Sequence, residues 1–202
     1  MRSYGSICDG ILAEKKDRFK KVNLYCLDES RFGLHTHTGR MLTARGVKPI
    51  AVSQQAFEST WLFGAFSPID GKRLLIEADG CDSDFFQIFM DELSKTDSEE
   101  LMLILLDNAS FHKTGKLKIP DNTAYFVHST SIALIYIPPY SPELNPAEKM
   151  WQRFKRAFTN KPFTSMKNVR DFLTEQVNLL TEDVVISTCA YEWIVLWNNW
   201  TV

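Results

Sequence analysis

The chain has 202 residues, enough for one domain with a short appendage, and its 45% hydrophobic and 24% charged residues are ordinary for a globular protein. A formal net charge of −2 means that the whole molecule does not attract nucleic acid, so any DNA-binding surface must be local. The apolar runs are too short to cross a bilayer, which argues against a membrane span. The four cysteines are scattered and form no CxxC pair, which argues against a zinc ribbon and favours reduced cytosolic thiols.

The predicted elements begin with strands. Residues 1–21 are mixed and strongly charged, which predicts a linker remnant. A strand is predicted over 22–27, and glycine and proline punctuation predicts a hairpin within 39–49. Two β-like runs, 60–66 and 73–77, flank a Pro/Asp/Gly turn and predict a second hairpin.

Helices dominate the second half of the chain. A helix capped by Asp82 or Ser83 is predicted to run to about Lys95, because large apolar residues recur there at helical spacing. The uninterrupted apolar run 101–106 is typical of a strand buried on both faces. The remaining predicted elements are a strand over 133–137, a proline-stiffened loop over 138–146, a helix from Pro146, and helices over about 165–180 and 182–198. This order predicts an α/β fold, a mixed sheet flanked by helices.

Two aspartates share a setting that suits a metal site. Asp28 and Asp107 each stand where an apolar strand gives way to a polar loop. The carboxyl ends of parallel strands meet at one edge of a sheet, so neighbouring strands would bring the two carboxylates side by side. Bound cations would relieve their repulsion, and hard oxygen ligands suit Mg²⁺ or Mn²⁺. Either aspartate taken alone is better explained as the cap of a turn or helix.

A third carboxylate, Glu148, opens the helix after the proline-rich loop. Asn145 is a natural N-cap and Pro146 fits the first helical position, so Glu148 would fall at the third and complement the helix dipole. The predicted buried stripe of this helix consists of Ala147, Trp151, Phe154 and Phe158. Glu148 lies at the border of that stripe, so its carboxylate can both cap the helix and reach a cleft.

Three segments carry a family resemblance: 27–33 (LDESRFG), 106–112 (LDNASFH) and 138–151 (PPYSPELNPAEKMW). In this order they resemble the IS630/Tc1/mariner transposases, which share a DDE catalytic domain of ribonuclease-H-like fold. The resemblance covers roughly residues 22 to 160. It implies that the catalytic and metal-binding triad is Asp28, Asp107 and Glu148.

Two other carboxylates lie near the triad residues in sequence, and one spacing within the triad is unusual. Glu29 follows Asp28 and should point to the opposite side of the strand, while Glu143 stands among prolines, off the helix. The 40 residues between Asp107 and Glu148 exceed the family's usual spacing, and the extra length is predicted in the 113–131 loop.

The resemblance also implies an activity and a domain plan. It implies metal-dependent hydrolysis of phosphodiesters at transposon ends and strand transfer of the 3′-hydroxyl into target DNA, with two Mg²⁺ ions for which Mn²⁺ can substitute. Residues 22–161 would form the catalytic domain, and 162–202 C-terminal helices packed on it. A non-catalytic domesticated DNA-binding module and a ribonuclease-H-like nuclease without strand transfer are the alternatives.

The implied partners are double-stranded DNA, both transposon ends and target, and further copies of the chain in a synaptic complex. The short segment before the first strand cannot hold a helix-turn-helix module, so a separate or upstream one is expected. The expected location is cytoplasmic, at the nucleoid.

Several polar groups have two interpretations. Candidate DNA contacts are Lys149, Arg153, Lys155, Arg156 and His112. The basic residues are equally compatible with a solvated helix face, and His112 with orienting a ligand or packing. The His35/His37 pair lacks a third metal ligand, and the acidic group around Asp82 fits a helix cap and turn better than a calcium loop. The C-terminal residues Trp193, Ile194, Trp197 and Trp200 recur at helical spacing and are predicted to pack in the core, with a dimer contact as the alternative.

Overall fold

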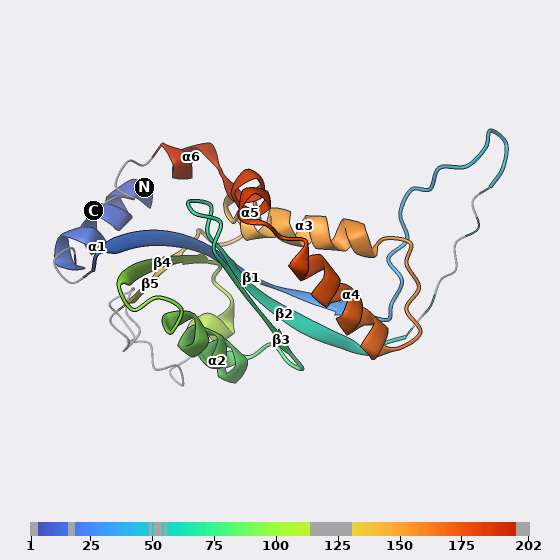
Figure 1. Cartoon of the computed structure of the whole chain (residues 1–202), viewed down its shortest axis with the longest axis horizontal. Coiled ribbons are helices and arrows are strands. Elements are labelled where there is room, and N and C mark those ends of the chain that lie inside the picture. The colour runs from blue at the N-terminus through green and yellow to red at the C-terminus, as the bar shows by residue number, and fades with distance from the viewer. Residues whose placement is uncertain are drawn as a thin grey trace.

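A five-stranded sheet forms the centre of the protein, with strand order β3-β2-β1-β4-β5 (Figure 1). The computed structural model describes residues 4–15, 19–48, 50, 54, 56–113 and 131–196. The strands are β1 (Lys21–Gly33), β2 (Ser59–Phe66), β3 (Arg73–Ala78), β4 (Glu100–Leu106) and β5 (Ile132–Tyr136). β1, β4 and β5 run parallel to one another, whereas β2 and β3 are antiparallel additions, so the predicted mixed sheet is confirmed.

Helices cover both faces of this sheet. In Figure 1, α2 lies on one side and α3, α4 and α5 lie on the other. Their bounds, with the remaining helical segments, are α1 (Tyr4–Lys15), α2 (Ser83–Ser94), η2 (Ser110–Lys113), η3 (Pro142–Leu144), α3 (Ala147–Phe158), α4 (Met166–Asn178), α5 (Glu182–Cys189) and α6 (Glu192–Val195). None of the helices among these described residues is long and apolar enough to cross a membrane.

Alternation along the strands divides the core into two. In β1, Leu24 and Cys26 face the cluster shared with α3, α4 and α5, whereas Tyr25 and Leu27 face the cluster under α2. β4 is buried along its whole length, as its unbroken apolar sequence predicts for a central strand. The side chain of Asp28, which follows Leu27, therefore lies on the α3 face of the sheet.

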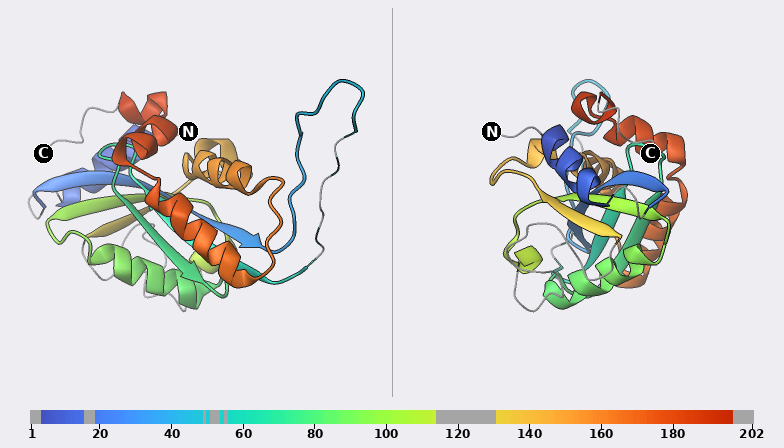
Figure 2. Two further views of the ribbon diagram at one scale, coloured as in Figure 1. Left: turned by 45° about the vertical axis from the view of Figure 1, so that its right-hand side comes forward. Right: turned by 90° about the vertical axis from the view of Figure 1, so that its left-hand side faces the viewer.

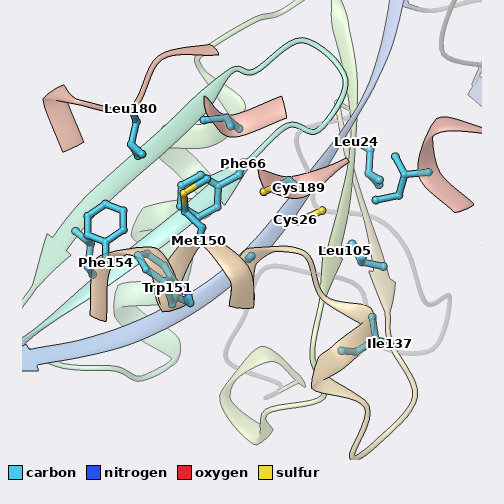
Figure 3. Packing of buried hydrophobic residues seen from close by; sticks show 14 of the residues in the cluster. Leu24, Cys26, Phe66, Leu105, Ile137, Met150, Trp151, Phe154, Leu180 and Cys189 are labelled. Atoms are coloured by element: carbon cyan, nitrogen blue, oxygen red, sulfur yellow. The ribbon is translucent and has the colours of Figure 1, made fainter. Parts of the chain in front are cut away.

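Helix α3 is held against the sheet by aromatic packing. Met150, Trp151 and Phe154 point from α3 toward the sheet beside Phe66 (Figure 3). The rings of Phe66 and Trp151 meet edge to face at 5.5 Å between centroids. A fully buried side chain of this size stabilises a fold by ~1.5–3 kcal/mol, so this stripe fixes the position of α3 on the sheet. The predicted buried stripe is thereby confirmed.

Three predictions about elements are wrong. No strand forms among the described residues of the hairpin predicted within 39–49. The described residues between β1 and β2 make an arm that projects from the sheet (Figure 2, left) and turns at Ala44 to Val47, and backbone hydrogen bonds at its base join Leu34 to Glu58 and Thr36 to Gln54. The N-terminal segment predicted as a linker contains α1, whose Cys8 and Ile11 are buried in the core. The predicted helix 182–198 is interrupted after Cys189, and Trp197 and Trp200 lie outside the described residues.

Candidate active site

Asp28 lies inside β1, whereas the sequence predicts it at the end of the strand. The parallel pairing of β1 with β4 stops at Cys26 and Leu105, while pairing with antiparallel β2 continues and sets Asp28 opposite Gly64. The side chain therefore emerges just where the parallel partner has ended. This position exposes one edge of β1 to the loops that follow β4 and β5.

Asp107 comes directly after β4, as predicted. Its Oδ1 accepts a hydrogen bond from the backbone N–H of Ala109 at 2.9 Å, and Nδ1 of His112 lies 2.9 Å from the same oxygen. The hydrogen bond from His112 holds the pKa of Asp107 below its ordinary value, although partial burial opposes it. Because both contacts use Oδ1, Oδ2 is the oxygen available to a ligand in the adjoining cavity.

Glu148 stands in the first turn of α3, and a buried asparagine fixes that turn. Asn145 donates from Nδ2 to the carbonyl oxygen of Leu27 at 2.8 Å, and its Oδ1 accepts from the N–H of Ala147 at 3.1 Å. Pro146 occupies the cap position, so Glu148 is one position nearer the helix start than predicted. Asn145 thus ties the start of α3 to the residue before Asp28.

The three predicted carboxylates share one cavity of about 530 Å³. The rest of its wall comes from the loop after β4 and from the proline-rich loop before α3: Asn108, Ala109, Ile137, Pro138, Pro139, Tyr140, Ser141, Pro142 and Asn145. Asn108 also donates a hydrogen bond to the carbonyl oxygen of Ile137, which joins these two loops. Sequence spacing does not reveal this contact, because it joins two turns that meet only in the fold.

Charge repulsion concentrates on Asp28. Burial raises its pKa well above the ordinary value, and the negative charges of Glu29, Glu148 and Asp107 raise it further, while a hydrogen bond from the backbone of Glu29 lowers it. A half-buried carboxylate facing two others is costly when ionised. A divalent cation would remove that cost, and the donor set consists of the hard oxygens that Mg²⁺ and Mn²⁺ prefer.

The cavity walls are not closed into a coordination shell. Within the described part of the chain, no three histidine, cysteine, aspartate or glutamate side chains converge closely enough to hold an ion. The oxygens of Asp28, Asp107 and Glu148 suit a divalent cation by their chemistry and share one cavity, but they do not converge on one ion position in this conformation.

His112, a predicted phosphate contact, is buried in this structure. The side chain is 1% exposed and lies between two carboxylates, with Nε2 at 3.1 Å from Oε1 of Glu29 and Nδ1 on Asp107. Burial alone lowers the pKa of His112, but the hydrogen bonds and charges of Asp107 and Glu29 outweigh it and raise the pKa to about 9. Glu29 points to the α2 side of the sheet, as strand alternation predicts, and there it holds His112.

The predicted basic residues spread over α3 in two directions. Lys149 places Nζ 4.1 Å from the ring centre of Tyr191, and both line a groove of about 620 Å³ that also contains Glu148. Lys155 lines a different groove, of about 450 Å³, together with Arg31 and His35 at the base of the arm. Arg153 and Arg156 are exposed. Glu143, the other rival carboxylate, lines the Lys149 groove and not the triad cavity.

The remaining polar motifs have structural roles. Asp82 caps α2 by accepting hydrogen bonds from the N–H groups of Asp84 and Phe85, as predicted. Glu77 and Asp79 pair with Arg170 of α4. His35 and His37 stand with ring centres 6.2 Å apart, and no third ligand joins them among the described residues.

The geometry agrees with a family assignment. A family model described as DDE superfamily endonuclease matches residues 23–170, most of the chain. The chain belongs to this family. A curated relative from Sinorhizobium fredii, the uncharacterized protein y4pE/y4sA, is 32% identical over 131 residues, which cover 64% of this chain and 80% of that protein.

Solved structures confirm the predicted ribonuclease-H-like fold of this DDE endonuclease. A Mos1 strand transfer complex superposes with a TM-score of 0.61 at 15% identity, covering 96% of this chain and 58% of that one. A Mos1 mariner paired end complex with Mn superposes with a TM-score of 0.62 at 14% identity, covering 96% of this chain and 59% of that one. A mariner Mos1 paired end complex with Mg superposes with a TM-score of 0.59 at 16% identity, covering 96% of this chain and 58% of that one. The chain therefore spans somewhat under two thirds of the transposase chains that it matches.

Proposed function

We propose that this DDE endonuclease is the catalytic domain of a DNA transposase. It would hydrolyse a phosphodiester at a transposon end and then transfer the freed 3′-hydroxyl into target DNA. The observation that carries the proposal is the shared cavity: Asp28 from β1, Asp107 after β4 and Glu148 on α3 line one opening. The solved Mos1 proteins of the same fold include a strand transfer complex and paired end complexes with Mn and Mg.

The triad divides the work by position. Two divalent cations would activate the attacking water and stabilise the leaving oxygen of an in-line displacement. Asp28, half-buried and opposite Gly64, would contribute to both cation positions. Asp107 offers Oδ2 because its Oδ1 is held by Ala109 and His112. Glu148 approaches from α3, whose start is tied to β1 by Asn145.

The DNA partner would lie across the cavity and over α3. Arg153, Lys155 and Arg156 are exposed there and would contact phosphates, making binding salt-sensitive. We also propose that further copies join in a synaptic complex at the nucleoid, and that a helix-turn-helix segment, separate or upstream, recognises the transposon ends.

A cleavage assay tests the triad. With Mg²⁺ or Mn²⁺, the wild-type chain, supplied with its end-recognition segment, should nick DNA that carries the element's ends. Asp28→Asn, Asp107→Asn and Glu148→Gln should each reduce the rate by at least about 10³-fold, because each removes a cation ligand of the reacting phosphate. Glu143→Gln is the matched control, since Glu143 lies outside the triad cavity. Cleavage that survives all three substitutions would refute the mechanism.

A second assay separates a transposase from a simple nuclease. DNA with a pre-cleaved 3′-hydroxyl end is mixed with a circular target, and joined products are counted. A transposase should form them and lose them in Asp107→Asn, whereas a nuclease without strand transfer would cut the first substrate and join none of the second.

A further inference from the structure

Tyr140 combines two features that folding alone does not explain. Its side chain is fully exposed, at 101%, although it belongs to the wall of the triad cavity. Its backbone has φ of 60°, in the left-handed region. Among the described residues only Asn160 shares this conformation without being glycine, and asparagine tolerates it far better than an aromatic residue does.

The surrounding loop holds this strained residue in place. Pro138 and Pro139 precede it and Pro142 follows it, which restricts the backbone on both sides. The N–H of Ile137 donates to the carbonyl oxygen of Leu106 at 2.9 Å, and Nδ2 of Asn145 donates to that of Leu27 at 2.8 Å, so both ends of the loop are fixed to the sheet. A rigid loop thus presents an aromatic ring to solvent beside three carboxylates.

An exposed ring adds little to the stability of the fold, and the left-handed backbone lowers that stability. Strain of this kind is retained where a site uses it. The ring carries no charge, and three prolines of the same loop, Pro138, Pro139 and Pro142, lie with it in the cavity wall. Its hydroxyl can donate to a phosphate oxygen, whereas its exposed face offers a second kind of contact. A flat apolar face suits another flat ring, and a nucleobase is the ring that lies next to any phosphodiester held by the triad.

We propose that Tyr140 stacks on a nucleobase of the DNA strand that enters the cavity, beside the scissile phosphate. The proposal rests on the proposed function and names the DNA feature that the site selects. Bases in an intact duplex are already stacked on their neighbours, so the ring can engage only a base that is unpaired or displaced. The site therefore favours DNA that is opened at the cleavage position. Stacking of this type tolerates any base, so it adds affinity without sequence preference.

Fluorescence of 2-aminopurine measures the stacking directly. The probe is a forked duplex with one unpaired 2-aminopurine, bound in Ca²⁺ by the chain with its end-recognition segment. The wild-type chain and Tyr140→Phe should quench the probe, because both present an aromatic ring. Tyr140→Leu, apolar but not aromatic, should lose the quench and bind the fork about tenfold more weakly. In cleavage of the same fork, KM should rise for Tyr140→Leu and not for Tyr140→Phe.

Two further variants keep the outcome interpretable. Asp28→Asn should abolish cleavage and retain the quench, so failure of the triad mechanism and failure of the stacking are seen separately. Tyr140→Asn removes the ring but suits the left-handed backbone, so its melting temperature should equal or exceed that of the wild-type chain while the quench is lost. An undiminished quench in Tyr140→Leu, or a large fall in melting temperature in Tyr140→Asn, would overturn the proposal.

Discussion

His112 links the two faces of the sheet at the level of single side chains. Its ring lies between Asp107, which lines the cavity, and Glu29, which faces α2. A protonated imidazole between two carboxylates can donate to both, which fixes the rotamer of Asp107 and leaves Oδ2 for a cation. We therefore propose that His112 positions Asp107 from behind the site.

Substituting His112 with asparagine should change the pH dependence of stability. The raised pKa of about 9, against an ordinary 6.5, means that protonation stabilises the folded state. This contribution is fully present below about pH 6.5 and is lost as the pH rises through about 9. His112→Asn should therefore lower the free energy of unfolding by about 3 kcal/mol at pH 6, as an upper bound, and by little at pH 10. Urea unfolding at a series of pH values, in EDTA, measures the difference.

A control substitution and a metal-binding measurement test the same geometry. His37→Asn alters an exposed histidine and should leave the curve unchanged. In His112→Asn, the Kd for Mn²⁺ should rise by about 10- to 100-fold, as when an outer-shell partner of a metal ligand is removed. Parallel pH curves for the wild-type chain and His112→Asn would show that the imidazole is not charged in the folded state.

At the scale of elements, the arm between β1 and β2 is anchored by a residue far away in sequence. Asn160, just after α3, donates its backbone N–H to the carbonyl oxygen of His37 at 2.8 Å. Its side-chain Oδ1 accepts from the N–H of Gly39 at 2.9 Å. Asn160 also adopts φ of 61°, which asparagine allows at low cost. The direction of the arm thus depends on the end of α3.

Replacing Asn160 with alanine should release the arm. The change removes the side-chain acceptor and places a Cβ-bearing residue without a polar side chain in the left-handed region, at a combined cost of about 2 kcal/mol. Trypsin should then cut at Arg40 and Arg45 about tenfold or more faster, because opening of the arm becomes easier. Asn160→Gly keeps the backbone conformation and isolates the loss of the hydrogen bond. Equal cleavage rates in all three proteins would mean that Asn160 does not hold the arm.

The elements that the sequence predicts correctly are those set by local periodicity. Strand 101–106 and the buried stripe of α3 follow from apolar spacing alone, and both are found as predicted. The arm is not predictable in this way, because glycine and proline mark a turn without saying whether its flanks pair. Its anchor at Asn160 is a contact between residues about 120 positions apart, which no local pattern contains.

The same distinction applies to the candidate site. Asp28, Asp107 and Glu148 could be selected because their motifs resemble a known family, and the fold places all three on one cavity. The contacts that hold the neighbouring residues in place could not be predicted from the sequence. Examples are the ion pair between Glu29 and His112 and the hydrogen bond from Asn145 to Leu27 of β1. Each depends on which strands are neighbours, so it becomes visible only when β1 and β4 are paired.

Across the whole molecule, the site lowers the stability that the core supplies. Asp28 has its pKa raised well above the ordinary value, first by burial and then by the charges of Glu29 and Glu148. The folded state therefore binds this proton more tightly than the unfolded state does. In the pH window between the ordinary and the raised pKa, stability falls as the pH rises. Without metal, ionisation of Asp28 therefore opposes folding.

Replacing Asp28 with asparagine should therefore stabilise the metal-free chain and abolish its response to metal. The amide cannot ionise, so the melting temperature of Asp28→Asn in EDTA should exceed that of the wild-type chain at pH 8, and the gap should narrow as the pH falls. Saturating Mn²⁺ should raise the wild-type melting temperature by about 5–10 °C, since a ligand at 100 times its Kd adds about 2.7 kcal/mol. Asp28→Asn should show almost none of this rise, while Glu143→Gln should match the wild-type chain in both conditions.

Calorimetric scans with and without Mn²⁺ supply all the comparisons. An Asp28→Asn protein that is less stable than the wild-type chain in EDTA, yet still stabilised by Mn²⁺, would show that the cation binds elsewhere and that the carboxylate of Asp28 supports the fold.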